Sequence, residues 1–332
     1  MKNRKIVLAR HPYELPDCHD FAFADEPLAP LVDGQVRVKL SMLGLEPSAR
    51  PRMNAASPYS QPIGIGGVIS GTGVGEIVES KCASLQIGEA VFVHSGWQSY
   101  FTCPAEEARR IDLDRAPMPQ WLSLLGLSAF TAYIGITELA RPQPGETVVV
   151  SAAAGATGAV AGQIARIWGA RAVGIAGGES KCRHVESLGF DACVDYKGDD
   201  FVGRLSAACP NGIDVDYENV GGAVLDAIFP RMNRYGRVIL CGLVSEYSMA
   251  KVPPGPNLWR AVYNALRIEG FLASRYWHRL PEFVEQALAW SGEGRLRQVE
   301  HIVDGFENTP FAFRELLMGK HFGKFMVRIA DV

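Results

Sequence analysis

The chain has 332 residues, of which 48% are hydrophobic and 21% charged, and its formal net charge at pH 7 is −3. This length accommodates about two domains with separate cores, and a near-neutral charge without a basic run argues against nucleic acid as a partner. No segment approaches about eighteen uninterrupted apolar residues, and the N-terminus lacks the apolar run of a signal peptide. We therefore expect a cytoplasmic protein with no membrane partner.

The first third of the chain has the pattern of a β-rich domain. Residues 35–41 and 73–78 alternate apolar and polar side chains, and residues 88–94 follow a turn glycine, as strands do. Residues 64–75 (GIGGVISGTGVG) contain many glycines but no following helix. We interpret these glycines as close backbone packing in a β-barrel, because a phosphate loop would run into a helix.

From about residue 124 the pattern changes to strands that alternate with helices. Strands are predicted over 147–150, 173–176, 192–196, 213–220, 237–242 and 267–273, and helices over 160–168, 181–188, 201 onward, 223–232, 258–266 and 281–290. Such alternation with short connections predicts a doubly wound parallel (Rossmann) sheet. We expect residues 301–303, 310–318 and 325–329 to return to the first domain. The prediction is an α/β protein with a β-rich, barrel-like (GroES-like) substrate domain, 1–123 and 300–332, and a Rossmann domain, 124–299.

Residues 147–178 form a strand, a small-residue turn, a helix and a second strand, which is the unit that binds a dinucleotide pyrophosphate. Gly155 would let backbone N–H groups approach the phosphates, and Gly158 would let the helix pack close to the strand. Ala152 stands where the usual G-x-G-x-x-G pattern has a glycine. We assign Ala152, Gly155, Ala156, Thr157 and Gly158 to the cofactor site; the alternative is a Gly/Ala-rich turn of another α/β protein.

The end of the second strand of this unit distinguishes NADP from NAD. An NAD site usually has an acidic residue there for the ribose 2′-OH, whereas this strand continues into Gly177 and Gly178. The open corner admits a 2′-phosphate, and Lys181 supplies a positive charge. Glu179 is the contrary observation, although its position fits the first turn of a helix. We favour NADPH, with Gly178 and Lys181 in its site.

Short sequences along nearly the whole chain match one family. They are GWQ at 96–98, LG at 125–126, TAY at 131–133, IAGG at 175–178, KC at 181–182, DYK at 195–197, ENVGG at 218–222, GFEN at 305–308 and GK at 323–324. In this order the chain resembles the medium-chain dehydrogenase/reductase superfamily, and in it the zinc-free branch of 2-alkenal, prostaglandin and bacterial curcumin reductases. The resemblance implies a homodimer and NADPH-dependent reduction of the C=C bond of α,β-unsaturated ketones and aldehydes. The Gly-His-Glu and the four-cysteine lobe of the zinc enzymes are absent from the sequence, so we expect no metal.

The resemblance also implies roles for single residues. Tyr263 matches the proposed catalytic tyrosine, whose hydroxyl can donate to the enolate that forms when hydride reaches the β-carbon. Lys181 and Tyr196 would contact the 2′-phosphate, and Asn219 and Cys241, at the carboxyl ends of successive strands, would face the ribose and nicotinamide. The alternatives are an aromatic on a helical face for Tyr263, a solvated lysine for Lys181, a strand-end aromatic for Tyr196 and a buried thiol for Cys241.

Two positions depart from the family pattern. His321 replaces a common Asn near the nicotinamide, and because histidine titrates near neutrality, pH-dependent NADPH binding is a hypothesis. Arg50 belongs to a matching Arg-x-Arg-Met, but the preceding Tyr-Met of the family is Ser48-Ala49 here. Arg50, Trp97 and Tyr263 are the candidates for substrate contact.

Two other functions fit the same sequence. A quinone oxidoreductase of the superfamily agrees with the fold and the missing zinc motif, but it explains the surroundings of Trp97 and Tyr263 less well. A non-catalytic NADPH-binding sensor needs only the phosphate site, so the retained tyrosine and nicotinamide-side residues disfavour it.

Overall fold

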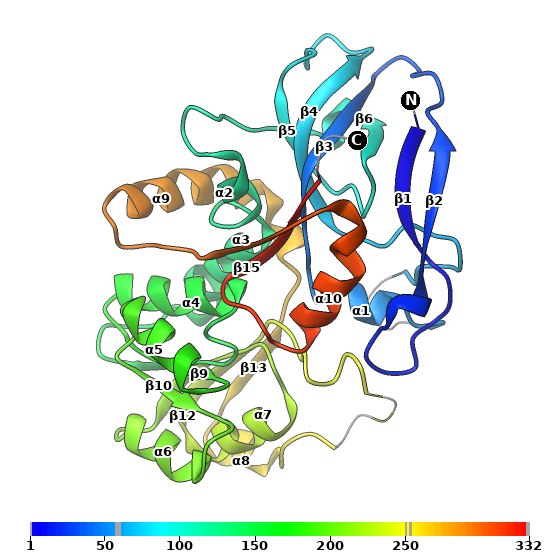
Figure 1. Ribbon diagram of the computed structural model, residues 1–332. Coiled ribbons are helices and arrows are strands. Elements are labelled where there is room, and N and C mark those ends of the chain that lie inside the picture. The colour runs from blue at the N-terminus through cyan, green and yellow to red at the C-terminus, as the bar shows by residue number, and fades with distance from the viewer. Residues whose placement is uncertain (1, 57–60, 250, 252–253, 330–332) are drawn as a thin grey trace. The chain divides into compact units, whose positions relative to one another are not determined.

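The computed structural model describes residues 2–56, 61–249, 251 and 254–329, and the chain divides into two compact units (Figure 1). Unit 1 consists of Met1–Ser123 and Glu300–Val332, and unit 2 consists of Leu124–Val299. Unit 1 thus contains both ends of the chain, and unit 2 is one continuous segment.

Unit 1 is built mainly from antiparallel strands. They are β1 (Lys2–Leu8), β2 (Phe21–Pro27), β3 (Gln35–Gly44), β4 (Thr72–Ser80), β5 (Ala90–Val93), β6 (Tyr100–Pro104), β7 (Arg109–Arg110), β14 (Glu300–Asp304) and β15 (Lys324–Arg328). β1 pairs with β2, and the larger sheet has the order β14-β15-β3-β4-β5-β7, with β6 also on β3. Its short helices are α1 (Ala49–Arg52), α2 (Met118–Leu122) and α10 (Thr309–Leu317). The predicted β-rich domain is confirmed.

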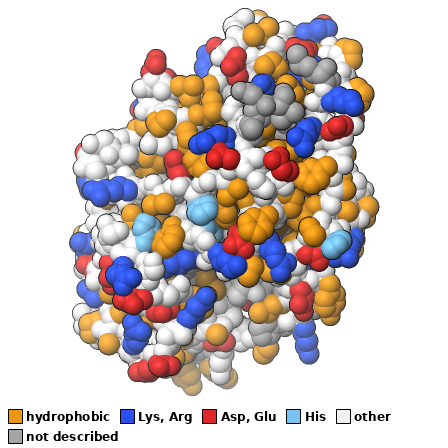
Figure 2. Space-filling model, viewed as in Figure 1, with side chains coloured by type: hydrophobic (Ala, Val, Ile, Leu, Met, Phe, Trp, Pro, Cys, Tyr) orange, Lys and Arg blue, Asp and Glu red, His pale blue; other side chains and the backbone are white. Residues whose placement is uncertain are grey.

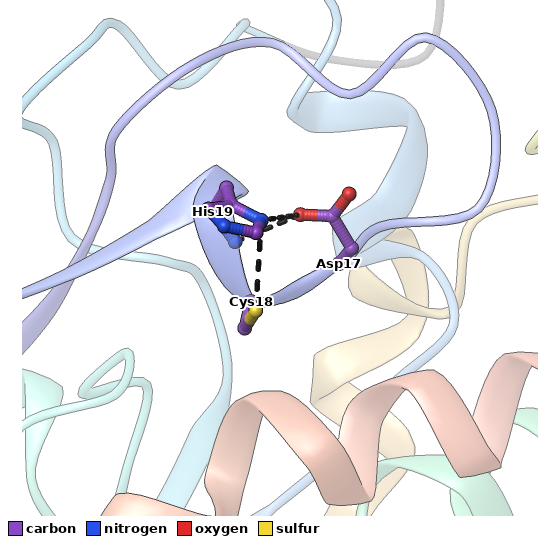
Figure 3. A group of neighbouring side chains, drawn as sticks. All are labelled: Asp17, Cys18 and His19. Carbon is purple, nitrogen blue, oxygen red and sulfur yellow. Dashed lines mark hydrogen bonds and ion pairs between the residues drawn. The ribbon is translucent and has the colours of Figure 1, made fainter.

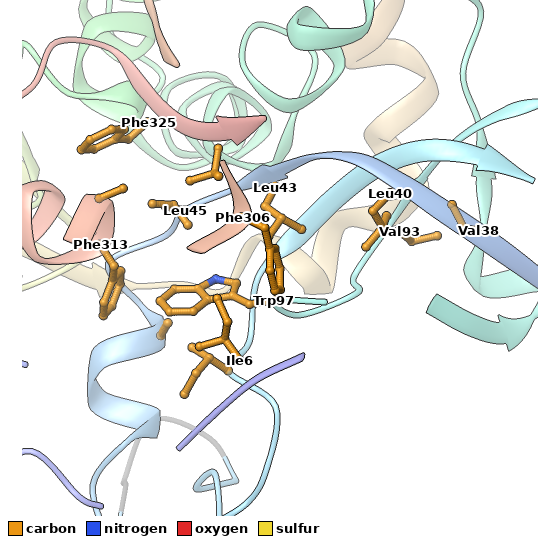
Figure 4. Packing of buried hydrophobic residues seen from close by; sticks show 14 of the residues in the cluster. Ile6, Val38, Leu40, Leu43, Leu45, Val93, Trp97, Phe306, Phe313 and Phe325 are labelled. Carbon is orange, nitrogen blue, oxygen red and sulfur yellow. The ribbon is translucent and has the colours of Figure 1, made fainter. Parts of the chain in front are cut away.

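The core of unit 1 joins the two ends of the chain. Trp97 is 0% exposed, and its ring centroid lies 5.6 Å from that of Phe21 and 5.1 Å from that of Phe313 on α10. Figure 4 shows Phe306 and Phe325 in the same cluster as Trp97. Residues after 300 therefore complete a core that the first hundred residues begin.

The glycines of residues 64–75 differ in how closely they are packed. A Cβ on Gly75 would lie 2.0 Å from the Lys39 carbonyl oxygen, and one on Gly73 would lie 2.6 Å from Ser95 Oγ. A Cβ on Gly64 or Gly66 would meet nothing within 4 Å. Close packing against backbone is thus confirmed for Gly75, whereas Gly73 packs against side chains. The prediction is wrong for Gly64 and Gly66, where the chain turns.

Unit 2 contains a six-stranded parallel sheet with the order β10-β9-β8-β11-β12-β13. The strands are β8 (Thr147–Val150), β9 (Arg171–Ala176), β10 (Ala192–Asp195), β11 (Ile213–Glu218), β12 (Met232–Leu240) and β13 (Arg267–Gly270). From β8 the chain adds two strands on one side and then crosses to add three on the other. This order is doubly wound, and its switch point lies between β8 and β11. The predicted Rossmann sheet is confirmed.

The helices of unit 2 precede, connect and follow these strands. They are α3 (Leu127–Ile134), α4 (Ala156–Ile167), α5 (Glu179–Ser187), α6 (Phe201–Ala208), α7 (Gly222–Ile228), α8 (Trp259–Tyr263) and α9 (Leu280–Gly292). The predicted helix over 223–232 ends early, because Pro230 lacks the N–H that would continue it, and Met232 opens β12 instead. The predicted helix over 258–266 and strand over 267–273 are also shorter than expected. Neither α3 nor β1, β2 and β6 was predicted.

The described surface carries both signs of charge. Figure 2 shows lysine and arginine side chains mixed with aspartate and glutamate, so the described residues of that face form no extended region of one sign. Among the helices in the described ranges, none is both long enough and apolar enough to cross a bilayer.

Candidate functional site

The turn after β8 leads directly into α4 at the switch point of the sheet. Ala152 has a φ of 49°, in the left-handed region that favours glycine, which explains why the dinucleotide pattern has a glycine there. A Cβ on Gly158 would lie 2.4 Å from the Ala152 carbonyl oxygen. Gly158 therefore lets the first turn of α4 pack against the preceding turn, and the predicted close contact is with that backbone, not with the strand.

Among the described residues, no side chain caps the amide groups at the N-terminus of α4. Gly155 is the N-cap residue, it has no side chain to accept a hydrogen bond, and the first turn has no acidic residue. The first amides of a helix have no partner inside the helix, and the helix dipole adds positive potential. Ala156, Thr157 and Gly158 lie in that turn. This arrangement suits a phosphate group.

The corner after β9 is open and glycine-lined. Gly178 has a φ of 98°, and a Cβ built on it would meet nothing within 4 Å. Glu179 opens α5 and pairs with Arg183 one turn later. Its interpretation as a first-turn residue is confirmed. The ion pair and the helix position explain the presence of this carboxylate without a contact to a ribose hydroxyl.

Basic and aromatic side chains converge on the same corner. A Cβ on Gly177 would lie 2.9 Å from the Tyr196 ring and 3.0 Å from Lys197 Cε. Lys181, on α5, is half-buried; its burial lowers its pKa, and the charge of Lys197 lowers that pKa further. Lys197 was not predicted, although its position beside Tyr196 was a usable signal. Two ammonium groups and a tyrosine fit a doubly charged phosphate.

The carboxyl ends of β11 and β12 carry Asn219 and Cys241. Asn219 Nδ2 donates to the Ser151 carbonyl oxygen over 2.7 Å, so this side chain is tied to the turn after β8. Cys241 is half-buried, and burial raises the pKa of its thiol to about 11, against the opposing effect of a hydrogen bond to Tyr217. The thiol is therefore protonated at neutral pH.

Two buried carboxyl groups, those of Asp216 and Glu218, lie on β11 shortly before Asn219 in the chain. They were not predicted from the sequence. Asp216 and Glu218 are fully buried on one face of β11, and neither oxygen of Asp216 has a hydrogen-bond partner within the described residues. The neighbours of Asp216 in register are Val149 and Val238. Burial, and secondly the charge of Glu218, raise the pKa of Asp216 well above its ordinary value. Asp216 therefore holds its proton more tightly in the folded protein than in the unfolded chain.

Replacing Asp216 with valine is expected to raise the melting temperature, by more at high pH than at low pH. Because the pKa of Asp216 is raised in the folded state, ionisation favours the unfolded chain once the pH exceeds about 4, by about 1.4 kcal/mol for each pH unit up to the folded pKa. Thermal unfolding at about pH 5 and about pH 8 measures the gain. Asp216→Asn, which stays polar but does not titrate, is the control. A gain independent of pH would contradict the prediction.

Tyr263 is the last residue of the five-residue helix α8. Its side chain is 73% exposed, and its ring centroid lies 6.0 Å from that of Trp259. Within the described residues its hydroxyl makes no hydrogen bond. The phenol is therefore accessible, and the contact with Trp259 matches the helical-face alternative as well.

The candidates in unit 1 are packed inside it. Arg50 is 1% exposed and donates to the carbonyl oxygens of Glu14 and Pro12, and Trp97 lies in the core. His321 is buried, and its ring stacks on Phe325 with centroids 5.4 Å apart. The observed contacts of Arg50 and Trp97 are with other residues of unit 1, and they stabilise its packing.

One cluster of possible metal ligands occurs among the described residues. Asp17, Cys18 and His19 have ligand atoms within 4.8 Å of one another on one exposed turn (Figure 3). Asp17 caps this turn, since its Oδ1 accepts from the His19 amide over 2.7 Å, and it also accepts from Arg10. These hydrogen bonds are sufficient to hold the three side chains close together, and we assign no metal to them.

A doubly wound sheet with a glycine turn at its switch point, joined in one chain to an antiparallel β-rich unit, is the architecture of a two-domain, dinucleotide-dependent oxidoreductase. Residues 4–111 match the family described as "N-terminal domain of oxidoreductase", and residues 156–290 match "Zinc-binding dehydrogenase".

Three similar proteins define the family more closely. The chain is 42% identical to the NADPH-dependent curcumin reductase of Escherichia coli K12, over 99% of this chain and 97% of that protein. It is 32% identical to the NADP(+)-dependent 2-alkenal reductase of Nicotiana tabacum, over 99% and 98%. The crystal structure of CurA from Vibrio vulnificus in complex with NADPH has a TM-score of 0.93 and 37% identity, over 99% and 100%. The chain belongs to the medium-chain dehydrogenase/reductase superfamily, in the family of curcumin, prostaglandin and 2-alkenal reductases, and this confirms the predicted family.

Proposed function

We propose that this protein reduces the C=C bond of α,β-unsaturated ketones and aldehydes with NADPH. It is an NADP-dependent oxidoreductase of the alkenal and curcumin reductase type, and its cofactor is NADPH. The single observation that carries the cofactor part is the corner after β9, where an open glycine turn, Lys181, Lys197 and Tyr196 meet. The bond that is reduced is inferred from the names of the relatives.

The residues of unit 2 fit such a cofactor. The first turn of α4 would hold the pyrophosphate with its amide groups, and Lys181 and Tyr196 would hold the 2′-phosphate. Asn219 and Cys241 would face the ribose and nicotinamide. When bound, NADPH supplies a hydride to the β-carbon of the substrate.

The protein must then stabilise the enolate, and the α-carbon must take up a proton, either from a side chain or from water. The phenolic hydroxyl of Tyr263 is proposed to donate a hydrogen bond to the enolate oxygen, which stabilises the negative charge that develops there. An enolate spreads its charge over oxygen and carbon, so a hydrogen-bond donor can serve without a Lewis acid. His321, in unit 1, stays a proposed nicotinamide-side residue.

The test is NADPH oxidation with a medium-chain enone, with the product identified by mass and NMR. A saturated ketone is the expected product and supports the proposal. An allylic alcohol would show carbonyl reduction instead. Turnover of a quinone without turnover of the enone would identify a quinone reductase instead. Tight NADPH binding without either reaction would favour a non-catalytic NADPH-binding sensor.

We also propose that two copies associate, as the resemblance implies. β13 is the outer strand of its sheet, and Ile268 on it is exposed. Leu258, Trp259 and Val262, in or beside α8, are exposed as well. A second copy would cover these apolar side chains. Light scattering measures the molar mass in solution, and a monomer at micromolar concentration would overturn this proposal.

A further inference from the structure

The turns after β8 and β11 are joined by hydrogen bonds centred on Ser151. Ser151 Oγ donates to Glu218 Oε1 over 2.6 Å and accepts from the Asn219 amide over 2.7 Å. Nδ2 of the Asn219 side chain donates a hydrogen bond to the Ser151 carbonyl oxygen. Ser151 and Glu218 are both fully buried. We call this set of three side chains the Ser151 clamp.

Glu218 also organises the chain that follows it. Its Oε1 accepts from the amides of Val220 and Gly221, the latter over 2.9 Å. Gly221 has a φ of 77°, which places a left-handed turn directly before α7. One buried carboxyl oxygen therefore fixes the path of residues 219–221.

The clamp leaves one polar atom of Asn219 available. The backbone amide and Nδ2 of Asn219 are both engaged with Ser151. Within the described part of the chain, Asn219 Oδ1 accepts no hydrogen bond, and the residue is half-buried at the carboxyl end of β11. Ligands of open α/β sheets bind at that edge, next to the switch point.

We propose that Ser151 and Glu218 are positioning residues, which hold Asn219 in the orientation that the ribose and nicotinamide half of NADPH requires. This inference rests on the proposed function, in which Asn219 faces that half of the cofactor. Neither Ser151 nor Glu218 touches the cofactor itself, because both side chains are turned into the protein. The clamp links the turn at the pyrophosphate to the loop at the nicotinamide, so the two parts of the site keep a fixed spacing.

The two halves of the cofactor allow a selective test. NADPH and adenosine 2′,5′-bisphosphate, which lacks the nicotinamide half, are titrated calorimetrically into the full-length protein and its variants. Ser151→Ala is expected to weaken NADPH by about tenfold, or about 1.4 kcal/mol, and to leave adenosine 2′,5′-bisphosphate within about twofold. Glu218→Leu, which removes the acceptor, is expected to behave in the same way with a larger loss.

Glu218→Gln is the conservative control. Glu218 Oε2 has no partner among the described residues, so a glutamine can keep its oxygen at the Oε1 position and place its amide nitrogen at the Oε2 position. NADPH affinity within about threefold of wild type is expected for this variant. The double variant Ser151→Ala, Asn219→Ala is expected to lose no more affinity than Asn219→Ala alone, because the serine acts through the asparagine.

Two results would overturn the inference. Equal losses for both ligands would show that the clamp only supports the sheet, and unchanged NADPH affinity in Ser151→Ala would show that it positions nothing. The measurement does not need a substrate. If the wild type fails to reduce enones and the selective loss is still seen, the proposed reaction fails and the clamp stands; if enones are reduced and Ser151→Ala binds NADPH normally, the clamp alone fails.

Discussion

Replacing Lys181 with alanine is expected to weaken NADPH binding by about 10- to 150-fold and to leave NADH binding nearly unchanged. A hydrogen bond to a charged group contributes about 1.5–3 kcal/mol, and each 1.4 kcal/mol corresponds to about tenfold in affinity. Lys181 is half-buried beside Lys197, and both effects lower its pKa. A 2′-phosphate would relieve this repulsion, whereas NADH has no such group. Fluorescence titration with both nucleotides measures the difference.

Arg183→Ala is the matched control for Lys181→Ala. Arg183 lies on the same helix and carries the same charge, but its side chain is exposed and pairs with Glu179. This change is expected to alter neither affinity by more than about twofold, since exposed ion pairs contribute little. Equal losses of NADPH and NADH affinity in Lys181→Ala would contradict the assignment of a 2′-phosphate contact.

Replacing Tyr263 with phenylalanine is expected to lower kcat with an enone at least about tenfold, while the Kd of NADPH stays the same. A positioned proton donor typically contributes about 10²–10⁴-fold to a rate, and water can supply part of that in its absence. The Tyr263 hydroxyl makes no hydrogen bond within the described residues, and the ring is 73% exposed. Its removal therefore costs little stability, and the expected loss is one of chemistry.

Tyr235→Phe is the matched control for Tyr263→Phe. Tyr235 is similarly exposed, at 64%, and lies on β12 beside Arg234. Wild-type turnover is expected for this variant. Steady-state kinetics with the same enone, together with a separate NADPH titration, measure both changes. Near wild-type turnover in Tyr263→Phe would assign the proton to water and remove the tyrosine from the mechanism.

Local patterns in the sequence were sufficient for the fold class. The four β-branched residues of β8, the small-residue turn and α4 follow one another directly, so strand, turn and helix could be predicted from adjacent residues. Glu179 could be assigned to a helix start for the same reason, because its surroundings lie within one turn. Where a local feature changes the course of the chain, as Pro230 does before β12, the predicted boundary was displaced.

By itself the sequence determined the family, the Rossmann sheet and the glycine-rich cofactor turn, because these depend on residue order and on contacts between near neighbours. Tertiary structure alone decided that Trp97 and Arg50 are buried and that Lys197 approaches Gly177. It also decided that Ser151 meets Glu218, 67 residues later in the chain. Parallel strands bring such distant residues to the same sheet edge, and a linear pattern does not record which residues become neighbours across strands.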